Sequence, residues 1–292
     1  MTMQQVQITA QPMTTPHLSG VEIAPLTHDE AMQMSTEELR RFQALVGSLS
    51  DADWSQPTAC DLWTVKDIVA HQAAHVRGFT SLGSFLGQLS PGLLRPYLKQ
   101  GMSMLDAWNQ SQVDLRRDAT PAQLIAEIND HATASLRGRD RIPAFVRGIT
   151  LPAPGLDQPR SMGYVFDLIY TRDMWMHRMD ICVATGRDMP MDSDHDQRMI
   201  SLIVRDLAEK AVKGLNGGAA LINLPGPAGG RYRIGSDAQP QATLKLDVPS
   251  FGLLTSGREK AANLLTDSRL HISGDLAFGR IVLDFCENRV LY

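Results

Sequence analysis

Two residues four positions apart, Asp173 and His177, have the types and spacing that most directly indicate chemistry. They lie in a stretch, residues 161–190, whose apolar residues recur at helical spacing and which Gly186 ends as a left-handed stop. On an α-helix, this spacing places the carboxylate and the imidazole one above the other on the same face. Such a pair can bind one divalent metal ion.

An earlier helix offers a third ligand, His71. This helix is predicted to begin at Thr64, with Asp67 in its first turn. His75 follows His71 by four residues and is an alternative ligand, and both lie near the edge of the apolar face. Taken alone, a histidine at such an edge is more often a hydrogen-bonded packing residue. The assignment of His71 therefore depends on the pair in the later helix.

Two histidines and one carboxylate suit zinc, and also nickel, cobalt, manganese or iron(II). Three protein ligands leave coordination positions open, which is typical of a catalytic site rather than a structural one. Asp67 lies one turn before His71 and Asp180 three residues after His177, so either carboxylate can fix an imidazole tautomer. Both can equally be solvated surface residues, which we favour for Asp67.

Substrate carboxylates would be bound by arginine, because a guanidinium group pairs with a carboxylate through two parallel hydrogen bonds. The sequence provides three candidates for this role: Arg178, Arg258 and Arg280. Each has an alternative role in a surface or interdomain salt bridge.

Length and composition narrow the class of protein. The 292 residues suggest two domains, and 43% hydrophobic and 21% charged residues are ordinary for a globular chain. A net charge of −4 argues against a nucleic-acid or anionic-membrane binder. Three widely spaced cysteines fit a reduced cytoplasm. We expect a cytoplasmic protein, because no signal peptide or membrane-spanning run is evident.

The predicted elements divide the chain into a helical part and a smaller mixed part. A capping box of Ser35 and Glu38 predicts the first clear helix, and residues 81–100 are expected to be a flexible crossover. Alternating apolar runs separated by Gly and Pro follow residue 216 and predict strands. We expect an α+β fold with three segments: a flexible tail at 1–25, a helical bundle at 26–216 and a small α+β domain at 217–292.

Two motifs give the chain a resemblance to a known family. WTVKDIVAH at 63–71 and RDMWMHRMDICVATGR at 172–187 resemble the mycothiol-dependent maleylpyruvate isomerase family, within the DinB-like metal-binding superfamily. The later stretches ATLKLDVPSFGLLTSGR and GDLAFGRIVLDF are similar to that family's sterol-carrier-like domain. The resemblance covers most of residues 35–292. It implies a DinB-like four-helix bundle with extra helices, followed by the sterol-carrier-like domain.

The same resemblance implies a divalent metal bound by His71, Asp173 and His177. Zinc is the first choice, and nickel, cobalt, manganese or iron are the alternatives. The family pattern has glutamate where this chain has Asp173. The shorter side chain moves the metal toward the helix or places a water between them. The implied cosubstrate is mycothiol or another small thiol. As a metal-bound thiolate it would attack an electrophilic small molecule, which makes the protein an isomerase or S-transferase. The alternatives are a non-catalytic small-ligand-binding protein and a metal-dependent hydrolase.

Overall fold

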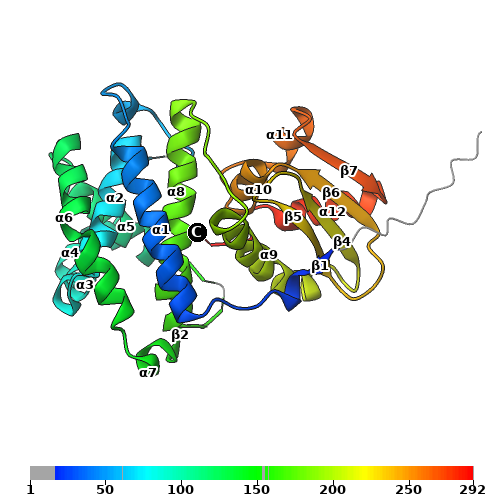
Figure 1. Cartoon of the computed structure of the whole chain (residues 1–292), viewed down its shortest axis with the longest axis horizontal. Coiled ribbons are helices and arrows are strands. Elements are labelled where there is room, and N and C mark those ends of the chain that lie inside the picture. Colours follow the sequence, from blue (N-terminus) through cyan, green and yellow to red (C-terminus); the bar gives the residue numbers. More distant parts are fainter. Residues whose placement is uncertain (1–16, 61, 153–154, 157, 292) are drawn as a thin grey trace, which may run out of the picture.

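The computed structural model describes residues 17–60, 62–152, 155–156 and 158–291. Figure 1 shows the chain in two parts, one built of helices and one built around a sheet, with the C-terminal end of the chain between them. This mixed architecture of helices and sheet confirms the predicted α+β class. Within these residues, no helix is both long and apolar enough to cross a membrane.

The helical part begins after residue 27. Its helices are α1 (His28–Val46), α2 (Val65–Gly78), α3 (Leu82–Gln88), α4 (Pro91–Leu98), α5 (Met104–Asp114), α6 (Pro121–Asp140), α7 (Ala144–Arg147) and α8 (Tyr170–Thr185). Helices α1, α6, α2 and α8 pack against one another in a ring. Two short strands, β2 (Thr150–Leu151) and β3 (Arg160–Ser161), pair antiparallel before α8.

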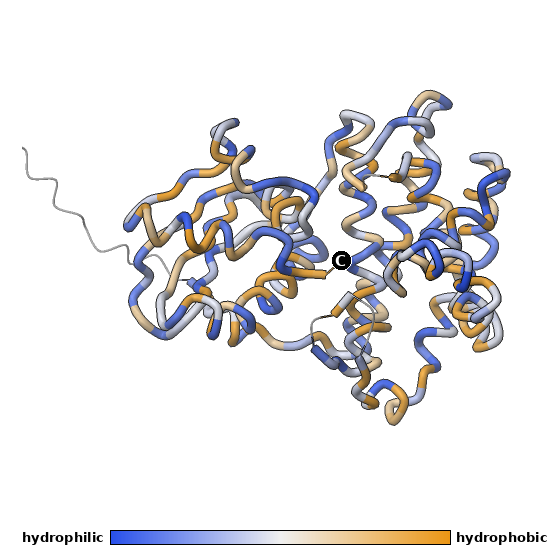
Figure 2. The backbone as a smooth tube through the Cα atoms, turned by 180° about the vertical axis from the view of Figure 1, so that it is seen from behind, coloured by the Kyte–Doolittle hydropathy of each residue, from blue (hydrophilic) through white to orange (hydrophobic). Residues whose placement is uncertain are grey.

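The sheet-containing part holds five strands in the order β1-β5-β4-β6-β7. Its elements are β1 (Leu18–Ser19), α9 (His195–Gly214), β4 (Ala219–Leu224), β5 (Gly230–Gly235), β6 (Ala242–Leu246), α10 (Val248–Thr255), α11 (Ala261–Thr266), β7 (Leu270–Gly274) and α12 (Leu276–Cys286). Strands β4 and β5 form an antiparallel hairpin, which bears out the strands predicted after residue 216. In Figure 2, hydrophobic and polar positions are interspersed along the elements, as expected for elements with one buried face.

Helix α8 lies between the two parts and contributes to both hydrophobic cores. Met174 and Ile181 pack with α1, α2 and α6, whereas Trp175 and Met179 pack with the core of the sheet. Gly186 ends the helix with a φ of 66°, the predicted left-handed stop. The predicted single helix over 161–190 instead begins with a π-helical turn, Tyr164–Ile169. Such turns are frequent near functional sites, and this one ends four residues before Asp173.

Two predicted features of the helical part differ in the structure. Helix α1 begins at His28, because Thr27 accepts a hydrogen bond from the backbone N–H of Glu30. The predicted capping box at Ser35 is therefore wrong. Ser35 is buried inside the helix, where its Oγ donates to the carbonyl of Ala31. The expected flexible crossover at 81–100 contains α3 and α4, which Ser81 and Pro91 help to start.

The segments next to the sheet also differ from the prediction. Residues 1–16 of the expected tail lie outside the described residues. Strand β1 pairs parallel with β5, and Gly20 follows it where an added Cβ would lie only 2.5 Å from Ala208 Cβ. Residues 18–22 are therefore ordered structure rather than tail. Helix α9, placed with the bundle by the predicted boundary at 216, packs on β5 and shares the core of the sheet.

Candidate metal centre

The predicted ligands come from two neighbouring helices of the ring. His71 and His75 lie on α2, and Asp173 and His177 lie on α8. The start of α2 is fixed by a capping box in which Thr64 and Asp67 bond to each other's backbone N–H. Asp67 is therefore a half-buried capping residue rather than the solvated surface residue that we favoured.

The side chains converge on the carboxylate of Asp173. His71 Nε2 lies 3.4 Å from Asp173 Oδ2, and His177 Nε2 lies 3.5 Å from Asp173 Oδ1. His75 Nδ1 is 3.3 Å from Asp173 Oδ2, and the donor atoms of His71, His75 and Asp173 all lie within 4.8 Å of one another. His177 forms a second such group with Cys60 and Asp180, and it meets the first group through Asp173 Oδ1. Gln72 Nε2 donates to Asp173 Oδ2 at 2.6 Å, a contact that the sequence did not predict. The structure thus brings the three predicted ligands and the alternative ligand together.

The tautomer of His71 is fixed by a chain of amides. Gln112 Oε1 lies 2.9 Å from His71 Nδ1, and Gln112 Nε2 donates to Gln88 Oε1 at 2.8 Å. Gln88 in turn donates to the carbonyl of Ala74 at 2.8 Å. Because the amide oxygen of Gln112 only accepts, Nδ1 of His71 carries the proton. Its Nε2 therefore presents a lone pair to the cluster.

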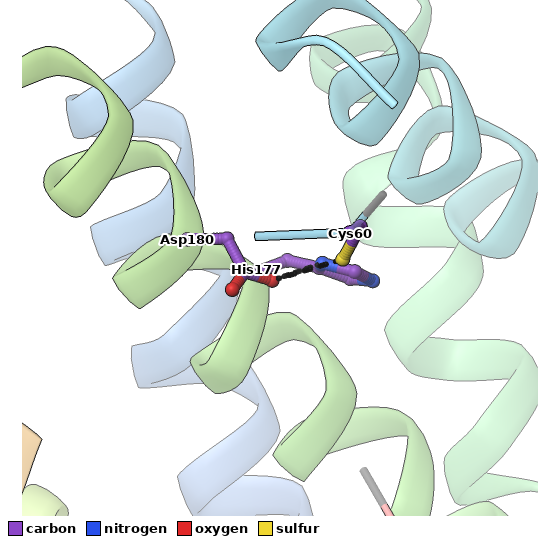
Figure 3. A group of neighbouring side chains, drawn as sticks. All are labelled: Cys60, His177 and Asp180. Atoms are coloured by element: carbon purple, nitrogen blue, oxygen red, sulfur yellow. Dashed lines mark hydrogen bonds and ion pairs between the residues drawn. The ribbon is translucent and has the colours of Figure 1, made fainter. Parts of the chain in front are cut away.

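His177 is held in the same way by a carboxylate. Its Nδ1 lies 2.9 Å from Asp180 Oδ2, as Figure 3 shows, and Asp180 is completely buried. Arg258, from the sheet-containing part, donates to Asp180 Oδ1 at 2.7 Å. Asp180 thus occupies one of the two positions considered for orienting an imidazole. A carboxylate behind a histidine in this way is typical of metal sites.

Cys60 joins this arrangement from the loop before α2. Its Sγ lies 3.5 Å from Asp180 Oδ2, and Arg258 Nη2 lies 3.5 Å from the same sulfur. The donor atoms of Cys60, His177 and Asp180 lie within 4.8 Å of one another. The guanidinium of Arg258 disfavours a second cation at this point, so we interpret the group as support for His177.

Electrostatics separate the two predicted histidine ligands. Burial, together with the charge of His75, lowers the pKa of His71 to about 3. Burial alone would also lower the pKa of His177, but the neighbouring Asp173 carboxylate raises it well above 6.5. Without a cation between them, His177 and Asp173 form an ion pair, whereas His71 is neutral at pH 7.

These residues fit a divalent metal ion. Nε2 of His71 presents a lone pair toward the Asp173 carboxylate, and Nε2 of His177 would do so once a metal displaces its proton, because the other nitrogen of each ring is satisfied behind it. His75 Nδ1 is buried and makes no hydrogen bond to the described residues. The donor set of imidazole and carboxylate suits zinc and its neighbours in the first transition row.

The three arginines proposed for substrate have different surroundings. Arg178 is buried and donates to Glu38 and Asp196, so its guanidinium is occupied inside the protein. Arg258 is bound to Asp180 and supports His177 instead of facing open space. Arg280 is exposed on α12, which packs on β6 and β7. The contacts of Arg178 favour a structural role over the predicted role in binding a substrate carboxylate.

Several site residues were not predicted: Cys60, Gln72, Gln88 and Gln112. They differ in how far along the chain they lie from the ligand that they support. Gln72 follows His71 directly on the same predicted helix, so it is the one that the sequence could have placed near the site. The other three meet the histidines only through the packing of helices, which residue spacing does not reveal.

The fold and the cluster together define a class of protein. A ring of helices carries a buried histidine–carboxylate site, and the sheet-containing part joined to it contributes Arg258 behind His177. Residues 35–182 match the family model of the mycothiol maleylpyruvate isomerase N-terminal domain. This match spans half of the chain, and the chain therefore belongs to the mycothiol maleylpyruvate isomerase family.

Two crystal structures have a similar fold. One is a mycothiol-dependent maleylpyruvate isomerase, with a TM-score of 0.52 and 14% sequence identity. The other is a histidine-to-alanine mutant of a mycothiol-dependent maleylpyruvate isomerase, with a TM-score of 0.53 and 13% identity. Each comparison covers 86% of this chain and 95% of the other. No curated protein matches the chain.

Proposed function

We propose that the chain is a metal-dependent enzyme that uses a small thiol, mycothiol or another, to attack an electrophilic small molecule. The observation that supports it most is the orientation of two imidazole rings. Nδ1 of His71 and Nδ1 of His177 are each held by an oxygen, so that Nε2 of each ring faces the Asp173 carboxylate. The reaction would be an isomerisation, as in the similar isomerase structures, or a transfer of the thiol. A DinB-like bundle and a sterol-carrier-like domain remain part of this proposal.

The protein residues in this proposal bind and orient. His71, Asp173 and His177 hold the metal, while Gln112 and Asp180 keep the two imidazoles in the required tautomers. When bound, a divalent cation there lowers the pKa of a thiol, so that the reactive thiolate is present near neutral pH. Burial of both histidines keeps water from the protein side of the site.

A thiol-dependent assay tests this function. Zinc-loaded protein should consume activated alkenes in the presence of mycothiol, and the rate should be lost without thiol or after metal removal. Turnover that persists without thiol would indicate a hydrolase. A metal-free protein with no turnover after incubation with divalent ions would indicate a binding protein. Protein with His177→Ala serves as the control for metal that binds elsewhere.

A further inference from the structure

His75 belongs to the candidate metal centre but has no part in the function proposed above. It lies one turn after His71 on α2, and its Nδ1 is 3.3 Å from Asp173 Oδ2. The donor atoms of His71, His75 and Asp173 lie within 4.8 Å of one another. Zinc–nitrogen bonds of about 2 Å need little further convergence of these atoms. His75 therefore stands where a metal ligand would stand.

The Nδ1 atom of His75 is buried without a hydrogen-bond partner among the described residues. Its contact with Asp173 is close, but it does not have the geometry of a hydrogen bond. A buried polar atom without a partner is rare and unfavourable. A metal ion beside Asp173 would satisfy this nitrogen, because the lone pair of a neutral imidazole is a common metal ligand.

His75 differs from the two predicted histidine ligands in what lies behind its ring. His71 is held by Gln112 and His177 by Asp180, each through Nδ1. Among the described residues, no side chain or carbonyl holds the other nitrogen of His75 in this way. Because the loss of such a support weakens metal binding by about 10- to 100-fold, His75 is the weakest histidine ligand of the cluster. The metal therefore depends on the three predicted ligands.

A fourth protein ligand closes the site to a thiol. Zinc with four protein ligands is typical of a structural site, whereas a catalytic site keeps one position for a molecule from solution. Use of a thiol therefore requires that one of the four ligands leaves, and His75 is the one without support. His75 and Asp173 also line a cavity of about 80 Å³, whose apolar walls include Leu105, Val165 and Ile169. This cavity gives the displaced ring and an incoming sulfur space beside the metal.

We propose that Nδ1 of His75 is a fourth, exchangeable metal ligand, which occupies the open position until a thiol displaces it. This inference rests on the proposed function of a metal-dependent, thiol-using enzyme. In the exchange, the neutral imidazole leaves, the thiol binds as a thiolate, and its proton passes to solvent without any transfer of electrons. Zinc favours thiolate ligands, so a thiol displaces the ring where water does not. His75 thus favours thiol chemistry over hydrolysis.

Nuclear magnetic resonance of the histidine nitrogens in the zinc-loaded full chain tests the bond directly. We expect two rings bound to zinc through Nε2, those of His71 and His177, and one bound through Nδ1, that of His75. Saturating 2-mercaptoethanol should return the Nδ1-bound ring to a free imidazole and leave the other two bound. This count is made on the wild type and needs no variant. The proposal is overturned if no ring binds zinc through Nδ1, or if that ring stays bound after the thiol binds.

Absorption of the cobalt-loaded protein measures the exchange. Thiol binding adds a sulfur-to-cobalt charge-transfer band, and titration with 2-mercaptoethanol gives the thiol Kd. In His75→Phe, which keeps an aromatic ring against Tyr170, this Kd should fall by about fivefold or more, because no ligand has to leave. The cobalt content should be unchanged. His271→Phe, at an exposed position of β7, is the control and should leave the Kd unchanged. An equal or higher Kd in His75→Phe contradicts the exchange.

The two tests distinguish this inference from the proposed function. If only His71 and His177 bind zinc and thiol-dependent turnover occurs, the proposed function stands and the assignment of His75 is wrong. If His75 binds zinc but no sulfur band forms in the wild type or in His75→Phe, the thiol-using function and the exchange fail. The bond between His75 and the metal then stands by itself.

Discussion

At the scale of single residues, the site depends on what lies behind each imidazole. His71 and His177 each have Nδ1 bound to an oxygen, so in each ring Nε2 is the nitrogen that faces Asp173 and that a metal would take. The two supports differ in strength, because Gln112 offers a neutral amide oxygen and Asp180 a buried carboxylate. Burial alone would raise the pKa of Asp180, but Arg258 keeps it below its usual range. Asp180 is therefore ionised and makes His177 the more basic ligand.

Removing the charge of Asp180 should weaken metal binding. In Asp180→Asn we expect the zinc Kd to rise by about 10- to 100-fold, because His177 loses its anionic partner. Competition with a chelating dye measures this. Asp67→Asn is the matched control, since Asp67 caps α2 and does not contact a ligand histidine in the structure. Equal zinc affinity in the Asp180 variant and the wild type would refute the supporting role.

Metal binding should also release a proton. The pKa of His177 is raised above 6.5, so the metal-free protein holds its proton at pH 7, whereas His71, with a pKa of about 3, is already neutral. A metal needs both imidazoles neutral, so zinc affinity should increase with pH until the raised pKa of His177 is passed. We expect release of about one proton from His177 at pH 7. Calorimetry in two buffers of different ionisation enthalpy measures it, and zero release would contradict the ion pair.

At the scale of elements, α8 is held by a buried polar network as well as by its two apolar faces. Arg178 on α8 donates to Glu38 on α1 and to Asp196 on α9. His195 Nε2 lies 2.7 Å from the other oxygen of Glu38. These bonds connect the helix that carries Asp173 and His177 to both parts of the protein. Arg178 thus has a structural role in the position of the site.

Loss of Arg178 should therefore reduce stability rather than substrate affinity. We expect Arg178→Met to lower the free energy of unfolding by about 3–5 kcal/mol, because two buried carboxylates each lose a charged partner. The KM of the remaining folded protein should be unchanged. Arg280→Met, on the exposed face of α12, is the control and should leave stability unchanged. Urea unfolding measures both. A stable Arg178 variant with a raised KM would restore Arg178 as a substrate ligand.

The helices that carry the ligands could be predicted because their signals are local. Thr64 with Asp67 starts α2, and Gly186 stops α8, and both features are present in the structure. Ser35 with Glu38 gave the same signal but failed, because Thr27 starts the helix earlier. The Glu38 side chain is instead used by Arg178. A capping motif predicts a helix start only where the first-turn N–H groups lack another partner.

At the scale of the whole molecule, the sheet-containing part completes the site in the helical part. Arg258 reaches Asp180 behind His177, and Leu291 lines a small cavity whose wall includes Asp173. Both lie more than a hundred residues from the loop of Cys60, which joins the same cluster. No periodicity in the sequence relates these segments. Their meeting follows from the packing of the two parts around α8, which explains why residue spacing indicated the candidate ligands and Asp180 but not Cys60, Gln112 or the role of Arg258.

The central claim is that His71, Asp173 and His177 together hold one divalent metal ion. The most direct measurement is elemental analysis of purified wild type beside His71→Ala and His177→Ala, with circular dichroism to verify folding. We expect about one equivalent of metal in the wild type and none in either folded variant, since each loses one of three ligands. Stoichiometric metal in both folded variants would contradict the account.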